Sequence, residues 1–406
     1  MRILLKTVLI SLSFIFFVGC ATNNISSTMK AQQGLSLEVG LYPYVPRLEQ
    51  FKETIQKQWY TKYPNVKLNF NTDWSGGYDN EPSNLDVFVF DAAYLDDYID
   101  KKFLLTLKQS QIDDFDDLLP YAKEGVKAAD SDNYYGIPQI GCGTLLFYRK
   151  NDLELKKAKT QSEIINTIGQ CTYDTLIPPK GKGLMMDFSS KTTNGDFYLE
   201  ATQDIYGKYT TNPPKPPRAE LLNPWSINNV SLWRQTTSNL HAKVGKLNRP
   251  KLFSKGYGRA YVGYSESMSS LDQKTRDEIE FKYLPFSDNN NVHLFYSDIA
   301  GINPRVVSNN MKPYAVELLN ILTSSETFVE ATKATEEDNV AQYLLPVRVN
   351  TFKELAKDYP LYTKLFKLVM ENDPKLFRLG VGANEWLENN KEVITNQIFN
   401  HNQCLK

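Results

Sequence analysis

The amino-acid sequence predicts an α/β fold of two lobes, and two observations support this prediction. The first is the order of elements near the start of the folded region. An alternating strand covers 35–41, helical spacing covers 48–63, and two further strands cover 66–74 and 86–95. The last strand is almost entirely apolar, as in a buried parallel sheet. The second is length, because 406 residues exceed what one hydrophobic core usually accommodates.

The rest of the chain continues this alternation of elements. A helix and turn are predicted over 117–138, an apolar stretch over 136–150, a Gly-rich turn with a strand over 252–268, strands over 279–286 and 294–306, and helices from 312 onward. The Pro-rich segment 212–224 is predicted to be a surface loop. We find no internal repeat.

The N-terminus indicates export. Basic residues within 1–6 precede an apolar run over 7–18 that is too short to span a bilayer comfortably, so residues 1–19 are predicted to be a signal peptide. Cys20 follows a lipobox-like sequence and is a candidate lipidation site, whereas a plain secretory signal cleaved near Ala21 is the alternative. Residues 20–33 are polar and are predicted to be a tether. We therefore expect an extracellular, periplasmic or membrane-anchored protein.

Composition limits the classes of ligand. The chain has 47 acidic and 46 basic residues, so it lacks the basic surplus of a nucleic-acid-binding protein. Aromatic residues make up 12% of the chain and include 24 tyrosines. Aromatic side chains suit a cleft that holds a flat or cationic small molecule.

Besides Cys20, the sequence has three cysteines: Cys142, Cys171 and Cys404. An odd number leaves at least one thiol unpaired within the chain, and spacing does not say which one. Cys171 and Cys404 could pair. The sequence has no CxxC or HExxH pattern and only three histidines, so we expect neither a metal nor another cofactor.

Polar and aromatic residues follow the predicted parallel strands. Ligands of such sheets bind beyond the carboxyl ends of the strands. The residues expected at this edge are Tyr42, Tyr44, Asp73, Trp74, Tyr78 and Asp91.

Cys142 lies in the stretch PQIGCG, between two glycines. It could be a small buried hydrophobic residue, half of a disulfide, or a nucleophile. Glycines at 141 and 143 would permit unusual backbone angles and would let a flat ring approach the sulfur. The residue alone does not decide between these alternatives.

The order of segments resembles the bilobal solute-binding proteins of bacterial ABC importers. The resemblance rests on YYGIP, FSKGYGRAYVGYSE and YSDIAGINPRV. It implies a type II periplasmic-binding-protein-like fold with an interlobe cleft and with crossovers near 139–143, 296–300 and 346. The implied lobes are 34–141 plus 298–346 and 142–297 plus 347–406. Cys142 would then lie in the hinge.

One branch of this fold, thiaminase I, is a closer match. The resemblance is most specific at Cys142 in PQIGCG, Glu266 in GYSES and Asp298 in YSDIAG. It implies that Cys142 is the nucleophile, Glu266 its base and Asp298 a ligand of the pyrimidine. The implied pocket residues are Tyr42, Tyr44, Tyr78, Asp91, Tyr264 and Tyr296.

The same resemblance implies the reaction and the partners. A monomeric enzyme would transfer the pyrimidinylmethyl group of thiamin, through a covalent cysteine adduct, to an organic amine or thiol. This chemistry needs a thiolate, and a carboxylate can generate one only if its pKa is raised toward neutrality. The aromatic sequence before Glu266 favours such burial, and a Cys–His pair with His293 is the weaker arrangement.

Each functional interpretation has a structural alternative. A glutamate after a strand is usually a surface ion-pair partner, and Asp298 could cap the next segment. At the level of the whole protein, the alternative is a non-catalytic thiamin- or pyrimidine-binding lipoprotein of an ABC importer. The Cys142–Glu266 pair distinguishes the two functions, because a passive receptor has no use for it.

Overall fold

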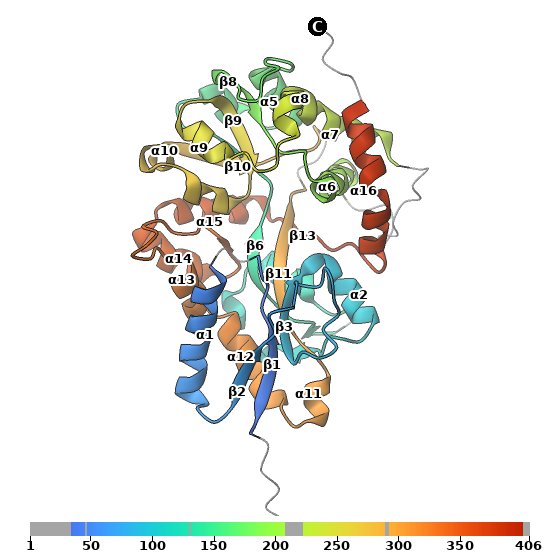
Figure 1. Cartoon of the computed structure of the whole chain (residues 1–406), viewed down its shortest axis with the longest axis vertical. Coiled ribbons are helices and arrows are strands. Elements are labelled where there is room, and N and C mark those ends of the chain that lie inside the picture. The colour runs from blue at the N-terminus through green and yellow to red at the C-terminus, as the bar shows by residue number, and fades with distance from the viewer. Residues whose placement is uncertain (1–33, 45–46, 130, 208–221, 289–291, 401–406) are drawn as a thin grey trace, which may run out of the picture. The chain divides into compact units, whose positions relative to one another are not determined.

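The computed structural model describes residues 34–44, 47–129, 131–207, 222–288 and 292–400 (Figure 1). The predicted signal peptide 1–19, Cys20 and the tether over 20–33 lie outside these residues, as does Cys404. The chain from Leu35 onward forms one compact unit. No helix in the described part of the chain is long and apolar enough to cross a membrane.

The larger of the two main sheets has the strand order β12-β6-β11-β3-β1-β2, with β13 beside β11. Its strands are β1 (Ser36–Gly40), β2 (Lys67–Phe70), β3 (Val87–Asp91), β6 (Ile137–Cys142), β11 (Leu294–Ile302), β12 (Leu345–Pro346) and β13 (Lys375–Leu376). β1 pairs in parallel with β2 and β3, whereas β11 is antiparallel to β3 and β6. The four strand regions predicted around β1, β2, β3 and β11 are thus confirmed.

Helices surround this sheet. They are α1 (Leu48–Lys62), α2 (Leu95–Asp100), α3 (Pro120–Val126), α11 (Arg305–Ser308), α12 (Lys312–Leu322), α13 (Ser325–Thr332), α14 (Val349–Asp358) and α15 (Leu361–Asn372). α1 packs against α12 and α13 and buries Phe51, Ile55 and Trp59, as their helical spacing predicts. Each such burial stabilises the fold by about 1.5–3 kcal/mol. The Trp59 indole also donates to the Val66 carbonyl at 2.7 Å.

The second sheet has four strands in the order β10-β7-β9-β8. They are β7 (Leu145–Arg149), β8 (Lys180–Met185), β9 (Gly258–Gly263) and β10 (Ile279–Tyr283). Its helices are α4 (Leu153–Lys157), α5 (Gln161–Ile168), α6 (Lys191–Tyr206), α7 (Pro224–Thr236), α8 (Asn239–Ala242), α9 (Arg249–Ser254), α10 (Gln273–Asp277) and α16 (Ala383–Asn400). α16 packs alongside α6 and α7 (Figure 1). A two-stranded sheet of β4 (Leu107–Lys108) and β5 (Asn133–Tyr134) completes the list.

The chain passes from the first sheet to the second directly after Cys142. Only Gly143 and Thr144 separate β6 from β7. Helices from the last part of the chain contact both halves, because α14 packs against α13 whereas α16 packs against α6 and α7. The lobe boundaries given above stay a prediction.

The glycines beside Cys142 serve close packing rather than unusual backbone angles. Neither Gly141 nor Gly143 has a positive φ, so that part of our expectation was wrong. A Cβ on Gly141 would lie 1.8 Å from Cε2 of Phe295, and one on Gly143 would lie 2.7 Å from Cε1 of Tyr283. The two glycines therefore let the rings of Phe295 and Tyr283 pack directly against the backbone on either side of Cys142.

We predict that Gly141→Ala destabilises the protein. The added methyl group overlaps the Phe295 ring, and such overpacking costs about 1–3 kcal/mol or more. Urea unfolding followed by circular dichroism measures the loss. Gly34→Ala is the control, because nothing lies within 4 Å of a Cβ at that position. Equal stability of the two variants would contradict the prediction.

Candidate active site

A pocket of about 380 Å³ lies where β3, β6 and β11 of the first sheet meet residues of α6 and of the segment that follows β9. Its lining is Tyr42, Tyr44, Tyr78, Asp91, Ile140, Gly141, Cys142, Asp196, Tyr264, Glu266, Tyr296, Ser297, Asp298 and Leu344. All nine residues predicted for the site are among them. The structure therefore brings them together, while the individual roles stay predictions.

The register of three strands places the central groups. Tyr296 of β11 lies opposite Cys142 of β6, and Asp298 lies opposite Asp91 of β3. Directly paired residues project from the same face of a sheet, as do residues two apart on one strand. These four side chains therefore share one face. The β6–β11 pairing shifts register between Asp298 and Ile299, an irregularity that often re-aims side chains beside active sites.

Tyrosines from two loops form one side of the pocket. Tyr42 and Tyr44 follow β1, and their rings meet edge to face with centroids 5.3 Å apart. The Tyr44 and Tyr78 rings are 6.0 Å apart. Gly76, with a φ of 78°, lets the Tyr78 loop approach, because a Cβ there would lie 2.4 Å from the Tyr42 ring. The Tyr78 hydroxyl donates to Asp91 Oδ2 at 2.5 Å.

Residues after β9 form the opposite side. Tyr264 follows this strand directly, and Glu266 lies in the first turn of a 3-10 helix, η5 (Ser265–Ser270). The ring of Tyr264 lies 6.4 Å from that of Tyr296. The predicted strand, turn and acid of this segment thus deliver Glu266 to the same pocket as Cys142.

Two acids of α6 were missed in the sequence analysis. Asp196 lines the pocket, and Glu200 lies behind Tyr296. They are spaced i, i+4 and so lie on one face of the helix. The sequence signal was this pair of acids inside a helix whose intervening residues include Phe, Tyr and Leu. Acids among such large apolar residues are candidates for burial.

Two residues expected at the strand ends are not in the pocket. Trp74 is buried, and its indole donates to the Val89 carbonyl at 2.7 Å, so it serves the core of the first sheet. Asp73 is exposed and does not line the pocket. Both follow β2, whose turn directs them away from the face that carries Cys142.

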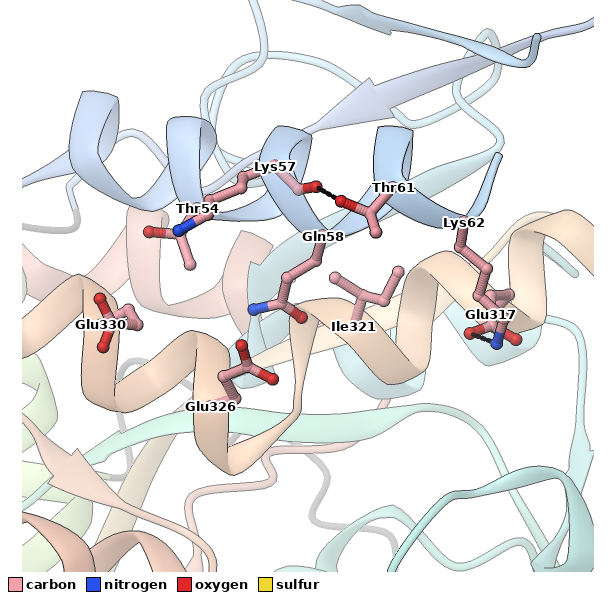
Figure 2. Close-up of a pocket in the computed structure, with 9 residues that line it drawn as sticks. All are labelled: Thr54, Lys57, Gln58, Thr61, Lys62, Glu317, Ile321, Glu326 and Glu330. Atoms are coloured by element: carbon pink, nitrogen blue, oxygen red, sulfur yellow. Dashed lines mark hydrogen bonds and ion pairs between the residues drawn. The ribbon is translucent and has the colours of Figure 1, made fainter. Parts of the chain in front are cut away.

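A second and larger pocket, of about 730 Å³, lies between α1, α12 and α13 (Figure 2). Its lining is Thr54, Lys57, Gln58, Thr61, Lys62, Glu317, Ile321, Glu326 and Glu330. Lys62 and Glu317 form an ion pair at one end (Figure 2). This lining contains no cysteine and none of the predicted site residues, so the chemistry belongs to the Cys142 pocket.

Comparison with known proteins agrees with this site. A family model described as the Thiaminase-1 domain matches residues 143–287. The chain is 32% identical over 394 residues to thiaminase-1 of Paenibacillus thiaminolyticus, covering 96% of this chain and 94% of that protein. The chain belongs to the thiaminase I family.

Solved structures extend the comparison. Clostridium botulinum thiaminase I in complex with thiamin is 36% identical, with a TM-score of 0.84 over 89% of this chain and 100% of that chain. A maltodextrin-binding protein from L. casei is 14% identical, with a TM-score of 0.60 over 90% of this chain and 94% of that one. Thiaminase I thus shares its fold with solute-binding proteins, as expected from the order of segments.

The thiol of this family member is neutral at rest. Cys142 is the free cysteine among the described residues, whereas Cys171 is disulfide-bonded. Burial raises the pKa of the Cys142 thiol well above its ordinary value, and the negative charges of Glu266 and Asp298 raise it further. A base must therefore act before the sulfur can attack. The sequence analysis left the pairing of Cys171 with Cys404 open, and Cys404 lies outside the described residues.

Glu266 has the acidity of a suitable base. Burial raises its pKa to about 7. Its Oε2 is buried and has no hydrogen-bond partner among the described residues. No hydrogen bond joins it to the Cys142 sulfur in this part of the chain, but its charge is the largest electrostatic influence on that thiol. The carboxyl of Glu266 thus shares the pocket with the sulfur, and its Oε2 can take a proton.

The pocket is acidic and has no basic counterpart. Burial raises the pKa of Asp91, Asp196 and Asp298 above their ordinary values. None of the described residues of the lining is Lys, Arg or His. Buried carboxyl groups without a basic partner attract a cation, or keep a proton that they can donate. Such a pocket favours a cationic ligand with basic ring nitrogens.

His293, the alternative partner for Cys142, lies outside the pocket lining. His293 stacks on Tyr283 with ring centroids 4.6 Å apart and does not line the pocket. Burial lowers its pKa to about 4. Within the described ranges, no group of three His, Cys, Asp or Glu residues could hold a metal ion. The carboxyl of Glu266 is thus the better-placed base.

We predict that Cys142 reacts slowly with iodoacetamide at neutral pH. Its alkylation rate should rise through a midpoint above about 8.5, the ordinary thiol value, because burial and carboxylates disfavour the thiolate. Mass spectrometry of the modified peptide measures the rate against pH. Glu266→Gln should move the midpoint down, because it removes a negative neighbour. A native midpoint below about 7 would contradict the prediction.

Proposed function

We propose that this enzyme cleaves thiamin at its methylene bridge, with Cys142 as nucleophile and Glu266 as general base. One observation carries the proposal: a free, poorly ionised thiol shares an acidic, aromatic pocket with the carboxyl of Glu266, whose pKa is about 7 and whose Oε2 has no hydrogen-bond partner among the described residues. Family membership and the thiamin complex of the Clostridium botulinum relative support thiamin as the substrate.

The pocket suits both rings of thiamin. Tyr42, Tyr264 and Tyr296 offer faces and edges on which a pyrimidine can stack. Asp91 and Asp298, paired across β3 and β11, can accept from the 4-amino group or hold a proton at a ring nitrogen. Burial raises the pKa of Asp196, and the positive charge of a bound thiazolium would favour its ionised form. These acids select a cationic substrate over a neutral one.

The first half of the reaction uses the proton of the thiol. Glu266 takes this proton, and the Cys142 thiolate adds to a ring carbon of the pyrimidine. The electrons displaced in the ring then break the bond between the methylene carbon and the thiazolium nitrogen. Thiazole leaves neutral, and the pyrimidine, now with an exocyclic methylene, stays bonded to sulfur.

The second half regenerates the enzyme. An amine or thiol adds to the exocyclic methylene, and the electrons return to expel Cys142 as a thiolate. This thiolate recovers the proton held by Glu266. The proton lost by the amine or thiol passes to solvent, directly or by way of a carboxylate, so the enzyme ends in its starting state.

The acidity of the thiol couples this chemistry to substrate binding. At rest, burial and, after it, the neighbouring carboxylates raise the pKa of the Cys142 thiol and disfavour the thiolate. A bound thiazolium places a positive charge in the same pocket, which opposes those carboxylates and favours the thiolate. The nucleophile is thus activated when its target is present.

Cys142→Ser should abolish thiazole release, by about 10³-fold or more, while thiamin still binds. A hydroxyl is far less acidic than a thiol, so the first proton transfer fails. Thiazole release with and without added aniline, and calorimetric binding of thiamin, measure the two properties.

Covalent labelling is the companion test. A 4-aminopyrimidine that carries a leaving group should add its mass to Cys142 and not to Cys171. The receptor alternative expects native protein and Cys142→Ser to bind thiamin equally, without turnover or adduct. Unchanged turnover by Cys142→Ser would rule out the nucleophile.

Glu266→Gln should slow thiazole release by about 10²–10⁴, the usual contribution of a general base. In the native enzyme kcat/KM should rise with pH through about 7, because the base must lose its proton to act. The variant should lose this rise. Glu354→Gln, at an exposed ion pair, is the control and should keep the native profile. An unaltered pH profile in Glu266→Gln would assign the base elsewhere.

We further propose that the enzyme is exported and functions as a monomer, with an amine or thiol as co-substrate. The basic and apolar character of residues 1–19 and the position of Cys20 support export and a lipid tether. The near balance of acidic and basic residues supports a small-molecule partner rather than nucleic acid.

A further inference from the structure

Glu200 is a buried carboxylate that the proposed mechanism does not use. It lies on α6, only 6% of it is exposed, and it does not line the pocket. Its Oε1 accepts two hydrogen bonds, from the Tyr296 hydroxyl at 2.6 Å and from the Thr144 hydroxyl at 2.8 Å. A buried carboxylate is costly unless its partners are specific, so these two contacts require an explanation.

Both partners of Glu200 adjoin the nucleophile. Tyr296 lies directly opposite Cys142 in the β6–β11 pairing. Thr144 follows Cys142 by two residues, in the short connection between the sheets, and its carbonyl accepts from the Leu284 amide at 2.9 Å. One oxygen of Glu200 therefore holds both Tyr296, opposite Cys142, and Thr144, in the segment that follows Cys142.

We propose that Glu200 is a positioning residue. It orients the Tyr296 ring and anchors Thr144, so that Tyr296 and Cys142 keep a fixed position relative to each other. This inference rests on the proposed function. Glu200 acts through Tyr296 and Thr144 and touches neither the substrate nor the reacting atoms.

The direction of the Tyr296 hydrogen bond has a chemical consequence. Because this hydroxyl donates to Glu200, its oxygen lone pairs are left for the pocket. Tyr78 differs, because its hydroxyl donates to Asp91 and is also hydrogen-bonded to Tyr42. The phenol oxygen of Tyr296 is thus held as an acceptor beside Cys142. Acceptors suit a cationic ring and N–H donors such as an amino group or an incoming amine.

Tyr296 is held at both ends, by Phe377 at its ring and by Glu200 at its hydroxyl. The Tyr296 ring packs on Phe377 with centroids 4.6 Å apart, so the ring is held by packing and its hydroxyl by Glu200. A side chain fixed at both ends loses little further entropy when a ligand binds. Removing the hydrogen bond between Tyr296 and Glu200 should therefore lower the rate of catalysis more than it lowers the stability of the fold.

A double-mutant cycle tests the proposal. Glu200→Leu and Tyr296→Phe should each lower kcat/KM for thiazole release by about 10- to 100-fold, the loss expected for a hydrogen bond to a charged group. The double variant should be no less active than Glu200→Leu alone, because Glu200→Leu already removes the hydrogen bond that Tyr296→Phe removes. Glu200→Gln should stay within about threefold of native, because its amide oxygen still accepts both hydrogen bonds.

Asp204→Asn is the matched control. Asp204 is a buried carboxyl of the same helix that accepts from the amides of Phe286 and Val292, away from the pocket. This variant should lower the melting temperature and leave kcat/KM unchanged. If Glu200→Leu and Asp204→Asn both lost only stability, Glu200 would be structural and the proposal would be overturned.

Other outcomes are equally decisive. Losses that multiply in the double variant would show that Glu200 acts independently of Tyr296 and would overturn the proposal. If Glu200→Leu does not fold, Glu200→Gln decides, and a loss beyond about tenfold contradicts an acceptor role. Failure of the proposed function is distinguishable, because the native protein would then release no thiazole and form no Cys142 adduct.

Discussion

The position of β11 between β3 and β6 is the constraint on which the site depends. This strand is antiparallel to both neighbours, so its first residues meet the ends of strands that run the other way. Asp298 is thereby set opposite Asp91, and Tyr296 opposite Cys142. Backbone hydrogen bonds, rather than contacts among the catalytic side chains, hold these groups together. The side chains can then remain partly unsatisfied, as a reactive site requires.

A second consequence concerns electrostatics. Several carboxyl groups share one pocket, and none of its described residues is basic. Burial and mutual repulsion raise the pKa values of these groups and of the thiol between them. This arrangement costs stability in the free protein and is relieved when a cation binds. The aromatic rings around the acids exclude water and strengthen both effects.

Much of the fold followed from local pattern. The helical spacing of Phe51, Ile55 and Trp59 identified α1, and the apolar run after Asp86 identified β3. Local pattern was less informative for residues whose surroundings are set by tertiary packing. Gly141 is required by the Phe295 ring, and Trp74 is held in the core by the Val89 carbonyl. In both cases the partner is distant in sequence, so the residue's surroundings could not be inferred from its neighbours.

The sequence by itself determined the class of fold, because hydrophobic periodicity is a local property, and it placed Tyr42, Tyr44, Tyr78 and Asp91 at strand ends. The other five predicted residues of the pocket were named through the resemblance to thiaminase I. Only the tertiary structure decided that the thiol is neutral at rest, that the pKa of Glu266 is about 7, and that Asp196 and Glu200 belong to the site. These properties depend on burial and on charges brought from other elements. α6 reaches the pocket through packing against α7 and α16, and no sequence spacing records that contact.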